Sequence, residues 1–328
     1  MREADCPEPI PLARSTEDRT CLGTGPRGVV RLEVAEVFEQ STLTEAYSSS
    51  PLRLLTPRSR GLSVWGYLSN LGGGLVAGDQ THVSCSVGRN SRCFLGTQSS
   101  TKIYRNPEGL PCQHQTVAAV ASGGLLVWAP DPVQAFAESI YAQRQKFLLA
   151  PGASLVLLDW FTSGRMARGE RWQFHCLQSR NEVWESSPEE LNPTLSDSSQ
   201  MPLNRASPGS RQVPQPTGGS KLLFLDSLFL DSRTQSLNSP CRLGRFNCVA
   251  FLLLLGPMVF AAAESLVKSF AGAELRQRSP TFMSVSPREH GALLRIAGER
   301  TLDVANALHT RLSFLAPLLG DHPWMRRF

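Results

Sequence analysis

The sequence predicts a mainly β fold: a large antiparallel or mixed β-rich body with about two α-helices toward the C-terminus. Short apolar runs alternate with polar residues at a period of two, as in Val30, Leu32 and Val34, which is typical of half-buried strands. Gly, Pro, Asn or Ser separates nearly all of these runs, as expected for an antiparallel all-β core. Helical periodicity is almost missing before the last third of the chain.

The expected elements follow from these runs in chain order. After the strand around Val30, strands are expected at 62–68, 81–87, 91–97, 115–122, 125–130, 147–160, 171–178, 223–232 and 246–255. Pro257 suits the first turn of a helix, which we expect to continue to about Ala271. A final helix is expected over 299–315, where one face carries Leu302, Ala305, Leu308 and Leu312.

Composition bounds the organisation of the 328 residues. Hydrophobic residues make up 41% and charged residues 19%, so the chain can bury a sizeable core. We expect a flexible extension at 1–27, then a single β-rich domain at 28–328, interrupted by a disordered Ser/Pro-rich insertion at 186–220. The net charge of +5 is mild and the arginines are scattered, which argues against nucleic-acid binding.

The cysteines and apolar runs bear on location. None of the eight cysteines forms a CxxC pair, and the first residues contain no apolar secretory segment. The apolar run 248–263 is shorter than the ~20 residues that a membrane span needs, and Gly256-Pro257 interrupts it. We therefore expect a strand, a turn and a helix there, no membrane segment, and a cytoplasmic protein with reduced thiols.

The stretch NLGGGLVAGD at 70–79 satisfies the G-x-G-x-x-A pattern of dinucleotide-binding loops. That loop works only when a helix follows, because the helix N-terminus holds the pyrophosphate. Here the alternating residues Val83, Cys85 and Val87 predict a strand instead. The glycines are better interpreted as a tight connection between strands, where two backbones approach closely.

Two further clusters contain charged and aromatic residues. Lys102, Tyr104 and Arg105 form either the solvated face of a strand or a partner contact. The stretch DWFTSGRMARGERWQF at 159–174 suggests a hairpin tip held by Arg–carboxylate pairs. Carboxylates there are also conceivable acid–base groups, but we do not expect catalysis, because no convincing catalytic constellation accompanies them.

Possible metal ligands are scattered. Cys112 and His114 can share one face of a strand, whereas His82 and Cys85 point to opposite faces. No ligand set has the number and spacing of a closed zinc site. From the residues alone, the chain is a mostly β binding or scaffolding protein rather than an enzyme.

Taken as a set, the motifs resemble the urease accessory protein D family, UreD, called UreH in some bacteria. The resemblance runs from about residue 28 to the C-terminus and omits the insertion. Its motifs occur in this order: Pro51-Leu52-Arg53, the GGGLVAGD loop, Gln98-x-x-Thr101-Lys102-x-Tyr104-Arg105, Pro130-Asp131-Pro132, Ala150-Pro151-Gly152-Ala153, Asp159-Trp160-x-x-x-Gly164-Arg165 and Arg168-Gly169-Glu170-x-Trp172.

The resemblance implies a non-enzymatic scaffold and metallochaperone. Members of this family bind apo-urease and accessory protein F, which recruits the GTPase accessory protein G carrying nickel. The complex assists nickel delivery and lysine carbamylation at the urease active site, and an internal channel is the proposed nickel route. No tightly bound cofactor is implied, only transient passage of Ni²⁺.

A route that must release Ni²⁺ should offer carboxylates rather than a Cys/His cage. We hypothesise that some of four acidic residues within the family motifs line it: Asp79, Asp131, Asp159 and Glu170. Arg165 and Arg168 would orient them, and with Lys102, Tyr104, Arg105 and Trp172 they form the partner or structural motif. Three alternatives stay open: salt bridges that support turns, a nucleotide-dependent enzyme using 72–79, and a generic β-rich interaction module.

Overall fold

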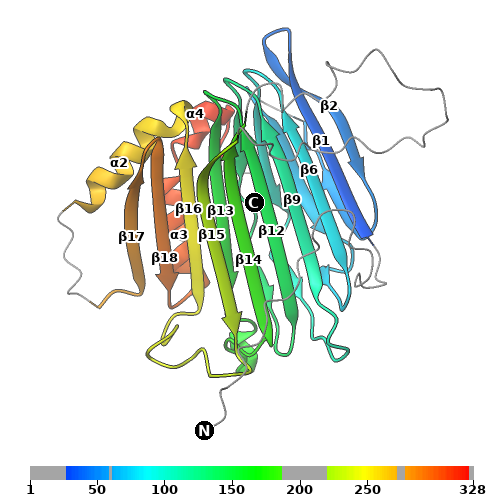
Figure 1. The fold of residues 1–328 in the computed structure, drawn as a ribbon, viewed down its shortest axis with the longest axis vertical. Coiled ribbons are helices and arrows are strands. Elements are labelled where there is room, and N and C mark those ends of the chain that lie inside the picture. The colour runs from blue at the N-terminus through cyan, green and yellow to red at the C-terminus, as the bar shows by residue number, and fades with distance from the viewer. Residues whose placement is uncertain (1–26, 59–60, 187–219, 272–277, 325–328) are drawn as a thin grey trace.

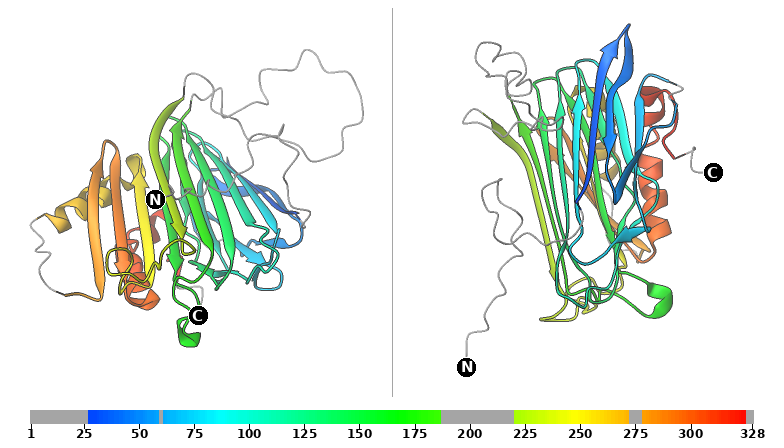
Figure 2. Two further views of the ribbon diagram at one scale, coloured as in Figure 1. Left: turned by 60° about the horizontal axis from the view of Figure 1, so that its bottom comes forward. Right: turned by 90° about the vertical axis from the view of Figure 1, so that its right-hand side faces the viewer.

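The computed structural model describes residues 27–58, 61–186, 220–271 and 278–324. These residues form two large β-sheets that face each other, here called sheet A and sheet B (Figure 1). The helices near the C-terminus lie on the outer face of sheet B, as the edge-on view in Figure 2 shows. The expected mainly β fold is confirmed.

Within these described residues, sheet A has seven strands and sheet B has 11. The order in sheet A is β15 (Lys221–Asp231), β14 (Cys176–Glu185), β12 (Ile140–Leu149), β9 (Cys112–Val120), β6 (Gln80–Val87), β1 (Arg27–Val37) and β2 (Gln40–Ser48). The main path of sheet B is β17 (Thr281–Arg288), β18 (Gly291–Gly298), β16 (Cys248–Leu255), β13 (Ser154–Thr162), β10 (Leu125–Trp128), β7 (Arg92–Thr97), β4 (Val64–Asn70) and β3 (Leu52–Leu55). Three short strands join sheet B beside this path: β5 (Gly74–Leu75), β8 (Thr101–Ile103) and β11 (Val133–Ala135).

The centre of each sheet is parallel, so of the antiparallel and mixed arrangements that were expected, the structure has the mixed one. From β6 to β14 the principal strands alternate between sheet A and sheet B, so neighbours within one sheet run in the same direction. Antiparallel pairs lie toward the sheet edges, such as β1 with β2 and β16 with β18, and reach inward as far as the pair of β13 with β16. Each sheet is therefore mixed.

Apolar side chains form three clusters in the core. The first lies between the sheets and includes Val30, Leu32 and Val34, which are at most 2% exposed. The second lies between sheet B and the helices, and the third lies between the sheets around Phe161 and Trp172. The period-two alternation seen in the sequence thus marks the faces that the sheets bury.

The described residues contain three α-helices near the C-terminus, where about two were expected: α2 (Phe260–Phe270), α3 (Thr301–Arg311) and α4 (Leu315–Leu319). The run 248–263 is strand β16, the short 3₁₀-helix η2 (Pro257–Val259) and the start of α2, as expected. The helix expected over 299–315 ends at Arg311. A separate short helix, α4, follows and contains Pro317.

Three local expectations were wrong. The run 147–160 is not one strand, because β12 ends at Leu149 and β13 begins at Ser154 in the other sheet. Residues 171–175 are not in a strand, since β14 begins at Cys176, and Trp172 has a positive φ of 53°. The segment between β13 and β14 is not a hairpin tip either, because those strands belong to different sheets. It carries the 3₁₀-helix η1 (Met166–Arg168), which projects beyond the strand ends (Figure 2). The expected extension and insertion lie almost entirely outside the described residues.

Candidate functional site

The glycine-rich loop connects strands, as the sequence predicts. A Cβ on Gly74 would lie 2.4 Å from the carbonyl oxygen of Lys102 and 2.8 Å from the Tyr104 ring, so only glycine fits. The carboxylate of Asp79 accepts a hydrogen bond of 2.9 Å from the N–H of Val76. Strand β6 follows directly. Asp79, 4% exposed, is therefore a turn anchor.

The candidate site is a belt of polar side chains, most of them neutral, on the inner face of sheet A. Tyr141, Gln143 and Gln145 share one face of β12 with Phe147, and so point into the core. Register places polar residues of neighbouring strands beside them. One row contains Thr81, His114, Gln143 and Ser179, and the next contains Thr116, Gln145, Asn181 and Asp226.

Asp159 is the carboxylate that sheet B presents to this belt. It is 3% exposed. Gln143 Nε2 donates to both of its oxygens at 2.9 Å, Ser179 Oγ donates at 2.8 Å, and Asn181 Nδ2 donates at 3.0 Å. Burial raises the pKa of Asp159, while these donors oppose the rise and the nearby charge of Asp226 adds to it.

A cavity of about 40 Å³ lies between the belt and sheet B, with room for about two or three water molecules. Asp131 and Asp159 both line it. The hydroxyl of Thr97 donates to Asp131 at 3.2 Å and accepts from its backbone N–H at 2.7 Å. Asn70 and Trp128 also line the cavity, and within the described chain their buried Oδ1 and Nε1 atoms have no hydrogen-bond partner.

His114 supplies the imidazole of the cavity wall. Its Nδ1 lies 2.8 Å from Thr81 Oγ1 and its Nε2 lies 2.9 Å from Thr116 Oγ1. Burial, with a smaller contribution from the charge of His82, lowers the pKa of His114 to about 4, so the ring is neutral at pH 7. Cys112 donates to the carbonyl of Val76 instead, and burial raises the pKa of its thiol to about 12.

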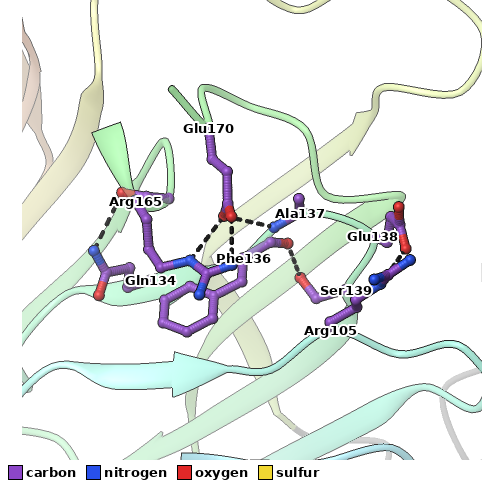
Figure 3. A network of polar contacts seen from close by, with 9 residues as sticks. Arg105, Gln134, Phe136, Ala137, Glu138, Ser139, Arg165 and Glu170 are labelled. Atoms are coloured by element: carbon purple, nitrogen blue, oxygen red, sulfur yellow. Dashed lines mark hydrogen bonds and ion pairs between the residues drawn. The ribbon is translucent and has the colours of Figure 1, made fainter. Parts of the chain in front are cut away.

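Glu170 lies apart from the cavity, on the segment that carries η1 (Figure 3). Its carboxylate forms a two-point ion pair with Arg165 and accepts a 3.1 Å hydrogen bond from the N–H of Ala137. The Arg165 guanidinium also stacks over the Phe136 ring at 4.3 Å. The Arg165 hydrogen bond is the main reason that the pKa of Glu170 is lowered, and Arg168 contributes electrostatically.

The remaining motif residues also form local contacts, or lie exposed, in the region around Phe136 and the segment that carries η1. Tyr104 donates to the carbonyl of Gly72 at 3.1 Å, and its ring meets Phe136 edge-on at 5.5 Å. Arg105 pairs with Glu138, and Lys102 lies half-buried in β8. Trp172, 1% exposed, donates to the carbonyl of Phe246 at 2.9 Å. Arg168 is exposed in η1.

The structure thus brings Asp131 and Asp159 together at one cavity and leaves Asp79 and Glu170 outside its lining. The motifs did not indicate the belt or Asp226. Across the described residues, no group of three or more His, Cys, Asp and Glu side chains is placed to hold a metal ion. Nor is any helix in that part of the chain long and apolar enough to cross a membrane.

Known proteins resemble this chain over nearly its whole length. The family model described as UreD urease accessory protein matches residues 26–328. "Urease accessory protein UreD" of Sorangium cellulosum is 37% identical over 328 residues, which cover 100% of this chain and 93% of the relative. "Urease accessory protein D" of Arabidopsis thaliana is 30% identical over 324 residues, which cover 90% of this chain and 98% of the relative.

Proposed function

Because the chain belongs to the UreD family of urease accessory proteins, we propose that it is a non-enzymatic scaffold and metallochaperone for nickel insertion. It binds apo-urease and the accessory proteins F and G in the cytoplasm, and nickel passes through the cavity between its two sheets. The ion is cargo, and no tightly bound cofactor takes part.

The buried carboxylate of Asp159 is the observation that supports this route. Four contacts from amide and hydroxyl donors hold it, and none of these donors carries a positive charge. A carboxylate buried without a cation is costly for folding. That cost is understandable if the negative charge serves a passing cation.

The lining also suits release of the ion. Ni²⁺ binds imidazole and thiolate ligands tightly and oxygen ligands less tightly. Asp131, Asp159 and the surrounding amide and hydroxyl groups offer mostly oxygen. His114 is one imidazole, and both of its nitrogens are engaged by threonine hydroxyls. Such a lining favours a transient stay over a permanent site.

The unpartnered atoms of the lining support a hydrated interior. A buried polar atom without a hydrogen bond costs about 1–3 kcal/mol. Asn70 Oδ1 and Trp128 Nε1 are such atoms, and both residues line the cavity. Water in the cavity would satisfy them and would keep a moving cation partly hydrated.

Assembly with the urease machinery is the test of the scaffold. The full chain is expected to co-elute with apo-urease and accessory proteins F and G, and urease activation is expected to require it. Titration of the isolated chain with GTP, ATP and NAD is expected to give no saturable binding. Saturable nucleotide binding would favour the enzyme alternative at 72–79, and failure to assemble would favour a generic β-rich interaction module.

A further inference from the structure

We propose that the free edge of β15 docks an extended segment of a partner protein, which joins sheet A as an additional strand. The segment carries apolar side chains on its outward side, and on the side facing sheet B it carries one apolar residue and at least one carboxylate. This inference is independent of nickel transit, since it uses no residue of the cavity.

β15 is a long edge strand. Its 11 residues pair with β14 on one side, and within the described chain no strand pairs with its other side. Such an edge presents a row of backbone N–H and C=O groups that another strand can satisfy. Charged residues, proline or short length commonly protect the edges of natural sheets.

The outward face of this strand is apolar instead. Leu222, Leu225 and Phe229 are 42%, 45% and 41% exposed. In the register with β14 they lie opposite Trp184, Glu182 and Gln178, so all three share the outer face of sheet A. A row of large exposed apolar residues along an unpaired edge is typical of an interaction surface.

Sheet B extends farther than sheet A beyond β15, which leaves room for one more strand of sheet A to stack on it. β15 lies over β16 and β18, because Phe224 contacts Phe251 at 5.8 Å between ring centroids and Asp226 pairs with Arg295 at 2.8 Å. β17 lies beyond them at the edge of sheet B (Figure 1). A strand added beside β15 would stack over β17, at the usual distance of about 10 Å between sheets.

The face of β17 toward this space is exposed. Ser284 lies opposite Arg295 in the sheet, so Phe282, two residues away, shares the face on which Arg295 meets sheet A. Phe282 is 47% exposed. Met283 and Val285 point the other way and pack in the layer under the helices. An apolar residue of the added strand would cover the Phe282 ring.

Charge indicates the chemistry of the segment. Alternation along β17 places Arg288 on the same face as Phe282, and the Arg295 side chain is 52% exposed. Asp226 pairs with Arg295, and Lys221 pairs with Glu289 at the end of the strand. A carboxylate on the inward side of the segment would complement the excess positive charge.

Synthetic peptides of about ten residues, a common strand length, test the proposal on the full chain. One peptide carries leucine at the outward positions, and its inward positions carry serine, two glutamates and one leucine placed to cover Phe282. A second contains the same residues in shuffled order, and a third is N-methylated at alternate backbone nitrogens. Fluorescence anisotropy measures binding, and hydrogen exchange measures protection of the β15 amides.

We expect the alternating peptide to bind and to protect β15, and the other two to fail. Phe282→Ser, Arg295→Gln and Leu225→Lys should each weaken binding by about tenfold or more. Leu302→Ser is the matched control, because Leu302 is 64% exposed on α3, on the helix side of sheet B.

Three results would overturn the proposal. Binding that survives N-methylation would exclude strand pairing. The absence of binding up to about 1 mM peptide would exclude the site. A dimer of the chain that Leu225→Lys dissociates would make a second copy the occupant instead of a partner segment.

Discussion

Gln143 of sheet A donates hydrogen bonds to both carboxylate oxygens of Asp159 in sheet B, each at 2.9 Å. This contact joins the two sheets at the level where the apolar layer of Leu155 and Leu157 gives way to the one around Phe161. A neutral amide thus holds a buried negative charge without cancelling it. The folding cost of that charge gives the first prediction.

Asp159→Asn should increase stability at pH 7 by about 1 kcal/mol or more, because it removes a buried charge while keeping the side-chain shape. Burial raises the pKa of Asp159 above its ordinary 3.8 in the folded protein. The penalty therefore grows as pH rises through the folded pKa, and it disappears below 3.8. Urea denaturation at several pH values measures the difference, and a less stable Asn variant at pH 7 would contradict the prediction.

His114 should make the protein sensitive to mild acid. Its pKa is about 4 in the folded protein against an ordinary 6.5, so the unfolded chain takes up the proton first as pH falls. Stability should therefore decline between pH 6.5 and pH 4, by up to about 3 kcal/mol for this group. His114→Gln should flatten that part of the pH profile in urea denaturation; an unchanged slope would show that the ring is not buried as a neutral base.

Gly74→Ala should destabilise the protein by about 3 kcal/mol, because the new methyl group meets the backbone at Lys102. Gly109→Ala is the control. Its φ is +72°, but a Cβ there meets nothing within 4 Å, so it should cost only about 1 kcal/mol of backbone strain. Equal losses in thermal unfolding would mean that the close approach at Gly74 is not what requires glycine.

Arg165→Ala should loosen the segment between β13 and β14 without affecting the cavity. Glu170 would lose its two-point partner and the Phe136 ring its stacked guanidinium. Hydrogen exchange at the Ala137 N–H, which donates to Glu170, should become faster. The pKa of Glu170 should rise toward its ordinary value, because Arg165 is the main cause of its depression. Unchanged exchange at Ala137 would show that the ion pair does not order this segment.

Local alternation predicted most of the strands, because the buried face of a strand such as β1 can be recognised from its own residues. It did not separate β12 from β13 within the run 147–160. It could not predict direction, since a period of two is the same in parallel and antiparallel sheets. The parallel centre arises from connections that cross between the sheets, and those depend on tertiary packing.

The candidate site was only partly predictable for a related reason. Asp159 and Glu170 are close in sequence, yet one lies in a buried strand and the other on the projecting segment. The polar belt consists of ordinary Gln, Asn, Ser and Thr residues that only the register across strands brings together. One signal was available: Gln143 and Gln145 lie an even number of residues from Phe147 and Leu149 in the same strand. They therefore share the inward face with these apolar residues.

The nickel content of urease after maturation with the Asp159→Asn chain tests the central claim most directly. Asp303→Asn is the matched control, because Asp303 pairs with Arg300 on α3, on the helix side of sheet B. With complex assembly verified for both chains, we expect urease matured with Asp159→Asn to hold less nickel per active site, and the control to match the natural chain. Full nickel loading with the Asp159→Asn chain would contradict passage of the ion past this carboxylate.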